Sequence, residues 1–142
     1  MRKHAAAAVL LLLVAGCGGL SKDELVAKGD AICKRVNARM AKEPDPQSAS
    51  DLELLAKRTV ALSDPAIAEM KALDPPGELQ PDFKKFVASL RRQRDLTKQI
   101  GDAAGAGDTA KIQKVTADAQ KAEQEYRRLS GKIGFKECGG GV

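Results

Sequence analysis

Cysteine and histidine side chains supply much of the nucleophilic and metal-binding chemistry of proteins, and this chain has few of either. It holds three cysteines, Cys17, Cys33 and Cys138, and a single histidine, His4. Cysteine thiolates act as nucleophiles or metal ligands, or pair into disulfides, and histidine is the usual general base near neutral pH. The place of His4 in the chain and the odd number of cysteines decide which of these uses stay open.

The first 16 residues have the features of an export signal. Arg2 and Lys3 form a positive tip, and an apolar run of twelve residues follows from Ala5 to Gly16. A membrane-spanning helix needs about 20 apolar residues, so this run is too short to span a bilayer. A basic tip, a short apolar middle and small residues at the end are typical of a cleaved secretory signal. We therefore predict that residues 1–16 are a signal peptide.

The segment that closes this run, "VAGC" from Val14 to Cys17, resembles the lipobox of bacterial lipoproteins. The resemblance implies that Cys17 takes a diacylglycerol on its sulfur, becomes the new N-terminus and is acylated there, for example with palmitate. Residues 17–20 are then the lipidated cysteine and a short linker. Two or three acyl chains anchor a protein stably. The expected location is the extracytoplasmic face of the cell membrane or the outer membrane. The alternative is an ordinary cleaved signal that leaves Cys17 as a free thiol.

The cysteine count favours lipidation over a free thiol. An odd cysteine in an exported chain needs an explanation, and lipidation of Cys17 gives one. It leaves Cys33 and Cys138 as an even pair in an oxidising compartment, where disulfides persist. The sequence thus predicts a Cys33–Cys138 disulfide, and the alternative is two separate reduced thiols.

Loss of the signal peptide removes most enzyme chemistry. His4 leaves with it, so the mature chain has no histidine for a nucleophile pair or a metal site. Removal of Arg2 and Lys3 lowers the formal charge from +5 to +3. Carboxylate pairs of the glycosidase kind stay possible, but the aromatic rings that usually hold sugars are scarce. The whole supply is Phe83, Phe86, Tyr126 and Phe135. We expect a protein without enzymatic activity, cofactor or metal.

The mature chain divides into four amphipathic helical segments. The first begins at Ser21, where Glu24 completes a capping box, and ends at the "EPDPQ" segment. The second is expected to begin at Ser50 with Glu53, and we expect Pro65 to bend one long helix rather than to split it. Apolar residues at helical spacing mark the inner faces of these two segments: Leu25, Gly29, Ile32, Val36, Met40, Leu52, Leu55, Leu62, Met70 and Leu73.

The two later segments follow the rigid connection "LDPPGELQP". The third helix ends at "GDAAGAGD", and Asp108 caps the fourth, after which Gly134 suits a left-handed closing position with Phe135 folding back. Their apolar stripes are Leu79, Phe83, Phe86, Leu90 and Ile100 in the third helix, and Ile112, Val115, Ala119, Ala122, Tyr126, Leu129 and Ile133 in the fourth. Residues 21–142 are therefore predicted to be all-α, an antiparallel four-helix bundle closed by one disulfide.

Four short stretches resemble a group of small exported or lipid-anchored bacterial helical proteins. They are "AIC" at 31–33, "LDPP" at 73–76, "GD" at 107–108 and "GFKECG" at 134–139. The resemblance implies a disulfide-closed helical domain, and it supplies no catalytic residue.

The densest positive stretch is "RRQR" with a lysine one turn later. An anionic-partner patch is predicted at Arg91, Arg92, Arg94 and Lys98. The alternative is a solvated helix face balanced by Asp82 and Asp95. Grooves that bind single-stranded nucleic acid place aromatic rings between their cations. Residues 91–98 contain no aromatic residue, so no nucleic-acid partner is expected.

The third helix also turns polar on its inner stripe at Gln93 and Thr97. In an antiparallel pairing with the fourth helix these residues face small side chains, which predicts a small-ligand pocket at Gln93, Thr97, Ala119 and Ala122. The alternative is that the alanines only let the helices approach, with Gln93 hydrogen-bonded or turned to solvent.

These inferences favour one function class and leave a second open. The first is a membrane-anchored envelope lipoprotein that acts as a non-enzymatic helical interaction module for an envelope protein. The second is a small-ligand or ion binding protein of the cell envelope.

Overall fold

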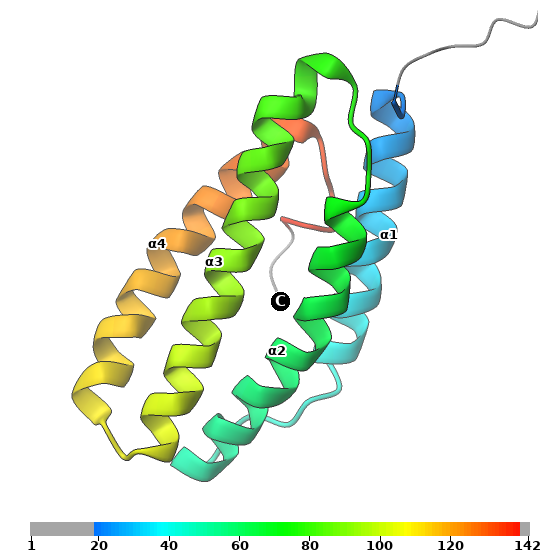
Figure 1. The fold of residues 1–142 in the computed structure, drawn as a ribbon. Coiled ribbons are helices and arrows are strands. Elements are labelled where there is room, and N and C mark those ends of the chain that lie inside the picture. Colours follow the sequence, from blue (N-terminus) through cyan, green and yellow to red (C-terminus); the bar gives the residue numbers. More distant parts are fainter. Residues whose placement is uncertain (1–18, 140–142) are drawn as a thin grey trace, which may run out of the picture.

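Four helices make up the part of the chain that the computed structural model describes, residues 19–139. They are α1 (Lys22–Met40), α2 (Ala49–Lys71), α3 (Gln80–Gly105) and α4 (Thr109–Ile133), with a 3₁₀ turn at Gly77–Leu79. Neighbouring helices run antiparallel, and α3 lies between α2 and α4 while α1 lies beside α2 (Figure 1). No strand occurs between residues 19 and 139. The prediction of an all-α antiparallel bundle is confirmed, while the predicted signal peptide 1–16 and Cys17 lie outside the described residues.

Side-chain caps fix most helix ends where the sequence predicts them. The Ser21 hydroxyl accepts the Glu24 amide at 3.3 Å, and the Glu24 carboxylate accepts the Ser21 amide at 2.9 Å, so the capping box is formed. The Asp108 carboxylate accepts the Lys111 amide at 2.9 Å at the start of α4. Each cap satisfies an amide that has no partner within its helix.

The predicted start of α2 at Ser50 is wrong. Ser48 is the N-cap, because its hydroxyl accepts the Asp51 amide at 3.1 Å and donates to the Asp51 carboxylate at 2.8 Å. The Ser48–Asp51 pair has the same spacing as Ser50–Glu53, and it begins the helix two residues earlier. An earlier start adds helical hydrogen bonds, and Glu53 is left to bind Lys57.

Helix α2 runs through Pro65 without ending. Proline has no amide to donate, so the Ala61 carbonyl one turn earlier loses its helical partner. Ala61 and Pro65 are both exposed, so water can solvate that carbonyl. The expectation of one long helix rather than two is confirmed.

The main hydrophobic core lies where α1, the end of α2, the start of α3 and the end of α4 meet. Phe86 is fully buried at its centre, with ring centroids 5.4 Å from Tyr126 and 5.0 Å from Phe135. A smaller cluster of Leu96, Val115 and Ala122 lies toward the α3–α4 connection. Helix α3 buries residues on two faces because it packs against both α2 and α4.

The segment after α4 turns back across the bundle onto α1. Gly134 has φ 99°, the left-handed conformation that reverses the chain, as predicted. Phe135 is then buried in the core against Gly29 of α1. A Cβ atom at Gly29 would overlap the Phe135 ring, so the close approach of tail and helix requires glycine there.

A disulfide fastens this tail to α1. Cys33 and Cys138 are bonded, as predicted, with Cα atoms 5.1 Å apart and a sequence separation of 105. The Asp30 carboxylate accepts the main-chain amides of Lys136 and Glu137, each at 2.9 Å. Closing a loop of this length lowers the conformational entropy of the unfolded chain. In the entropic model this stabilises the fold by about 4.7 kcal/mol. The tail therefore joins the first helix to the last.

We expect Gly29→Ala to destabilise the fold, because the added methyl group must displace the buried Phe135 ring. The free energy of unfolding should fall by about 1–3 kcal/mol, measured by urea denaturation. Gly131→Ala is the matched control, because Gly131 is exposed in α4. A Cβ atom added there would have no atom of residues 19–139 within 4 Å outside its own helix backbone. Alanine there should stabilise the fold by about 0.5–1 kcal/mol. Equal effects of the two substitutions would contradict the assigned contact.

Candidate functional site

A cavity lies in the middle of the bundle, where α1 stands over α2 and α3. Its volume is about 210 Å³. The floor and walls are mostly aliphatic side chains from these three helices: Ile32, Val36, Ala66, Ile67, Met70 and Leu90. Cys33 also lines it, so one half of the disulfide forms part of the wall. An apolar hollow with a few polar groups is the usual form of a small-molecule site.

Gln93 and Thr97 bring polar atoms to this cavity. The Thr97 hydroxyl donates to the Gln93 carbonyl at 3.0 Å, one turn earlier in α3. Gln93 Nε2 is buried, and within residues 19–139 it has no hydrogen-bond acceptor. A buried donor without a partner loses its hydrogen bonds to water and gains none in the protein, which destabilises the fold. Gln93 Nε2 is thus one of two buried donors of cavity-lining residues that lack an acceptor in the described part of the chain, and the other, Arg94 Nε, lies 3.1 Å from an Asp64 oxygen.

Two hydroxyls of α2 face the same space. Thr59 donates to the Leu55 carbonyl at 2.8 Å, and Ser63 donates to the Thr59 carbonyl at 2.7 Å. Both hydrogens are used within the helix. The oxygen atoms keep lone pairs that can accept a hydrogen bond.

The structure brings together only half of the predicted pocket. Gln93 and Thr97 line the cavity, while Ala122 is buried in the smaller cluster and Ala119 packs partly buried against it. Gln93 and Thr97 lie on the face of α3 that borders α1 and α2. Leu96 lies on the face that meets α4.

The other residues that line the cavity do not follow from the predicted pocket, and among them are Tyr126 from α4 and Arg94 from α3. Arg94 was assigned to the surface patch, but Leu90, Arg94 and Thr97 have i, i+4, i+7 spacing and share one helix face. That spacing was the signal that could have placed Arg94 inward. Arg94 Nη1 lies 2.8 Å from Asp95, and its Nε lies 3.1 Å from Asp64 without hydrogen-bond geometry.

The phenol of Tyr126 is held in its neutral form. Burial raises its pKa well above the ordinary value of 10.0, the nearby Asp30 carboxylate adds to the rise, and Arg127 opposes it weakly. Burial disfavours the charged phenolate because the interior solvates it poorly. Tyr126 is therefore a neutral phenol in the wall of the cavity.

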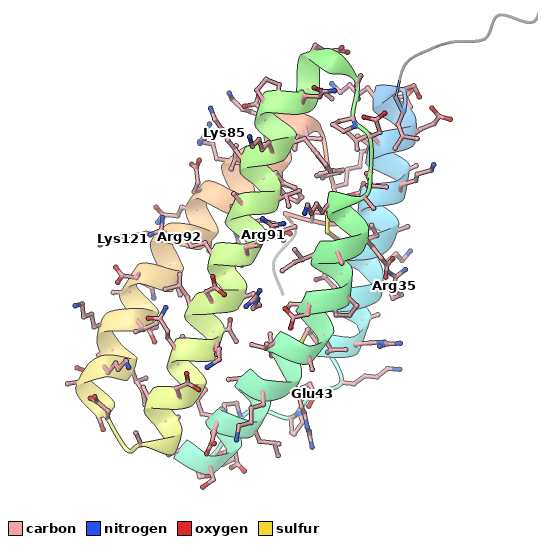
Figure 2. The ribbon with its side chains drawn as sticks, viewed as in Figure 1. Arg35, Glu43, Lys85, Arg91, Arg92 and Lys121 are labelled. Atoms are coloured by element: carbon pink, nitrogen blue, oxygen red, sulfur yellow. A yellow bond between two sulfur atoms is a disulfide. The ribbon has the colours of Figure 1, made fainter. Side chains whose placement is uncertain are left out.

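The predicted anionic-partner patch is divided in the structure. Lys98 pairs with Asp102 at 2.7 Å, a hydrogen bond that lowers the pKa of that carboxyl, and Arg94 is half-buried against two carboxylates. Arg91 and Arg92 are exposed, and Figure 2 shows them projecting on different sides of α3. Neither makes an ion pair with a side chain of residues 19–139.

Arg91 belongs to the rim of a shallow groove at the α2–α3 connection. The groove has a volume of about 600 Å³, with Phe83, Val87 and Pro75 on its floor. Lys71 and Lys84 stand on the same rim. This end of the bundle is also where the Leu20 amide donates to the Asp74 carbonyl at 2.7 Å.

Neither a metal-binding cluster nor a membrane-spanning helix is present in the described residues. Within residues 19–139 no group of three or more His, Cys, Asp or Glu side chains is arranged to hold a metal ion. None of the helices α1 to α4 combines the length and apolar composition needed to cross a membrane.

Comparisons with known proteins leave the family open. No family model, no curated protein and no solved structure matches the chain. The likeness to lipid-anchored helical proteins therefore stays a prediction from the residues.

We predict that the Tyr126 phenol ionises only above pH 10.0 in the folded protein. Tyr126 is the sole tyrosine and tryptophan is absent, so the ultraviolet absorbance of tyrosinate reports this residue alone. The unfolded chain loses the proton at lower pH, so this contribution to stability is complete below pH 10.0 and declines as the pH rises toward the folded-state pKa. The urea-unfolded protein is the control. An ordinary midpoint in the folded protein would rule out a buried phenol.

Proposed function

We propose that this chain is a lipid-anchored protein of the cell envelope whose helical domain binds another envelope protein and catalyses no reaction. The pairing of the cysteines carries the proposal. Cys33 and Cys138 are joined, which leaves Cys17 in the lipobox-like segment as the third cysteine. A disulfide in a chain of this kind fits an oxidising compartment outside the cytosol. Lipidation of Cys17 accounts for the odd sulfur.

The start of the fold supports a short tether. Leu20 is hydrogen-bonded to Asp74 and packs against the core. Cys17 comes three residues earlier, a reach of about 10 Å in extended chain. An anchor at Cys17 therefore holds the α2–α3 connection close to the bilayer. Lys71 and Lys84 at this end suit an anionic lipid surface.

The outer face of α3 is the surface we assign to the partner. Lys85, Arg91 and Arg92 are exposed there, and none has an ion-pair partner in the part of the chain described. Figure 2 shows Arg92 on the side of α3 toward α4 and Arg91 on the side toward α2, so the assigned surface extends across α3. Unpaired cations attract an acidic surface and steer its approach, and arginine is enriched in protein interfaces. The occupant we propose is an acidic region of an envelope protein.

Cys17→Ala should release the protein from membranes. The acyl chains provide the attachment, since a single cysteine carries them all. The measurement is fractionation of cells into membrane and soluble material, with metabolic labelling by palmitate. Cys33→Ser combined with Cys138→Ser is the control, and it should stay in the membrane fraction and keep its label. Palmitate on the Cys17→Ala form would contradict the proposed anchor.

Charge reversal on α3 should weaken partner capture. A photocrosslinker at Ala88, which is exposed between the lysines and arginines of α3, reports contact in native membranes. Arg91→Glu with Arg92→Glu should lower the yield on the order of tenfold, because two attractive contacts become repulsive. Lys28→Glu with Lys34→Glu changes the net charge equally on exposed positions of α1. Equal yields from the two double variants would remove the assigned face.

A further inference from the structure

The central cavity has the size of a small organic molecule. A space of about 150 Å³ holds a benzene-sized ligand, and this one is about 210 Å³. Because this cavity is somewhat larger than a benzene site, it can hold a molecule of about six to ten non-hydrogen atoms. Most of its surface would contact aliphatic side chains, so the larger part of the molecule is apolar.

The polar atoms of the cavity call for a group that both accepts and donates. Gln93 Nε2 offers a hydrogen with no acceptor among residues 19–139. The hydroxyl oxygens of Thr59, Ser63 and Thr97 have given their own hydrogens to helix carbonyls and can only accept. A carboxamide or hydroxyl group matches both needs. An ammonium group does not, because it has no lone pair for the Gln93 amide.

The charges around the cavity favour a neutral ligand over an anion. Arg94 is the cation that lines it, and Asp64 and Asp95 already lie against its guanidinium. Two carboxylates thus flank one cation. A carboxylate ligand would lose its hydration without gaining a free positive partner.

We propose that the cavity between α1, α2 and α3 is a binding site for a small neutral molecule with an apolar body and one carboxamide or hydroxyl group. Gln93 donates to the oxygen of that group, and the hydroxyls of Thr59 and Thr97 accept its hydrogen. The site extends the function beyond anchoring and partner binding. It does not depend on the lipid or on the partner.

The test compares two probes of the same shape, cyclohexanecarboxamide and cyclohexanecarboxylate. The full chain is held in phospholipid vesicles at neutral pH, and the fluorescence of Tyr126, the single tyrosine, reports occupancy. The carboxamide should give a saturable change. The carboxylate should bind at least about tenfold more weakly. A cavity filled only by water would give no saturable change with the carboxamide, and that result overturns the proposal. Equal binding of both probes also overturns it.

Three variants locate the binding. Gln93→Leu keeps the volume but removes the donor, so carboxamide affinity should fall about fivefold to tenfold. Gln99→Leu makes the same change on an exposed position of α3 and should leave affinity unchanged. Ala66→Leu fills the cavity and should abolish binding, and it also corrects for probe dissolved in lipid. Thermal unfolding checks that each variant is folded. Unchanged affinity in Gln93→Leu or in Ala66→Leu overturns the site.

Discussion

The attachment of the C-terminal tail to α1 holds the first helix against the rest of the bundle. Helix α3 packs extensively along α2 and α4, whereas α1 meets α2 over a smaller surface. The disulfide, the two amides held by Asp30 and the ring of Phe135 over Gly29 add the attachment that α1 lacks. Ion pairs from Arg35 to Glu69 and from Glu43 to Arg58 contribute at the solvent side, where such pairs stabilise little.

The central cavity follows from the same attachment. Ile32, Cys33, Val36 and Asn37 of α1 form one wall of it. Without α1 held in place this space becomes an open groove on the α2–α3 surface. The disulfide therefore links two features that are far apart in the sequence: the closure of the helical domain and the partly open cavity that α1 completes. Under the proposed anchoring at Cys17, this space lies within a domain held close to the bilayer.

Local signals in the sequence predicted the ends of the helices well, because a cap depends on residues three or four positions apart. Ser21, Asp108 and Gly134 are the positions where such signals were unambiguous. The sequence does not single out Ser48, because Ser48 and Ser50 each stand three residues before an acidic residue and either could be the N-cap. Ser48 is the N-cap in the structure because it gives the longer helix. The pocket was only half predicted because its walls depend on which faces of α3 meet α2 and α4. Helical spacing gives α3 a single inner stripe, which includes Gln93 and Thr97. It does not show that Leu96 lies on a different face, or that Tyr126 and Arg94 line the same cavity.

The claim that joins fold, location and function is that two of the three cysteines are bonded to each other and the third carries lipid. Intact-mass spectrometry of the protein extracted from native membranes, alkylated before and after reduction, measures this directly. We predict an N-terminus at Cys17 that bears a diacylglycerol and a further acyl chain. We also predict no alkylation until reduction, after which Cys33 and Cys138 both react. A chain that retains Met1, or thiols at Cys33 and Cys138 that react without reduction, would contradict the claim.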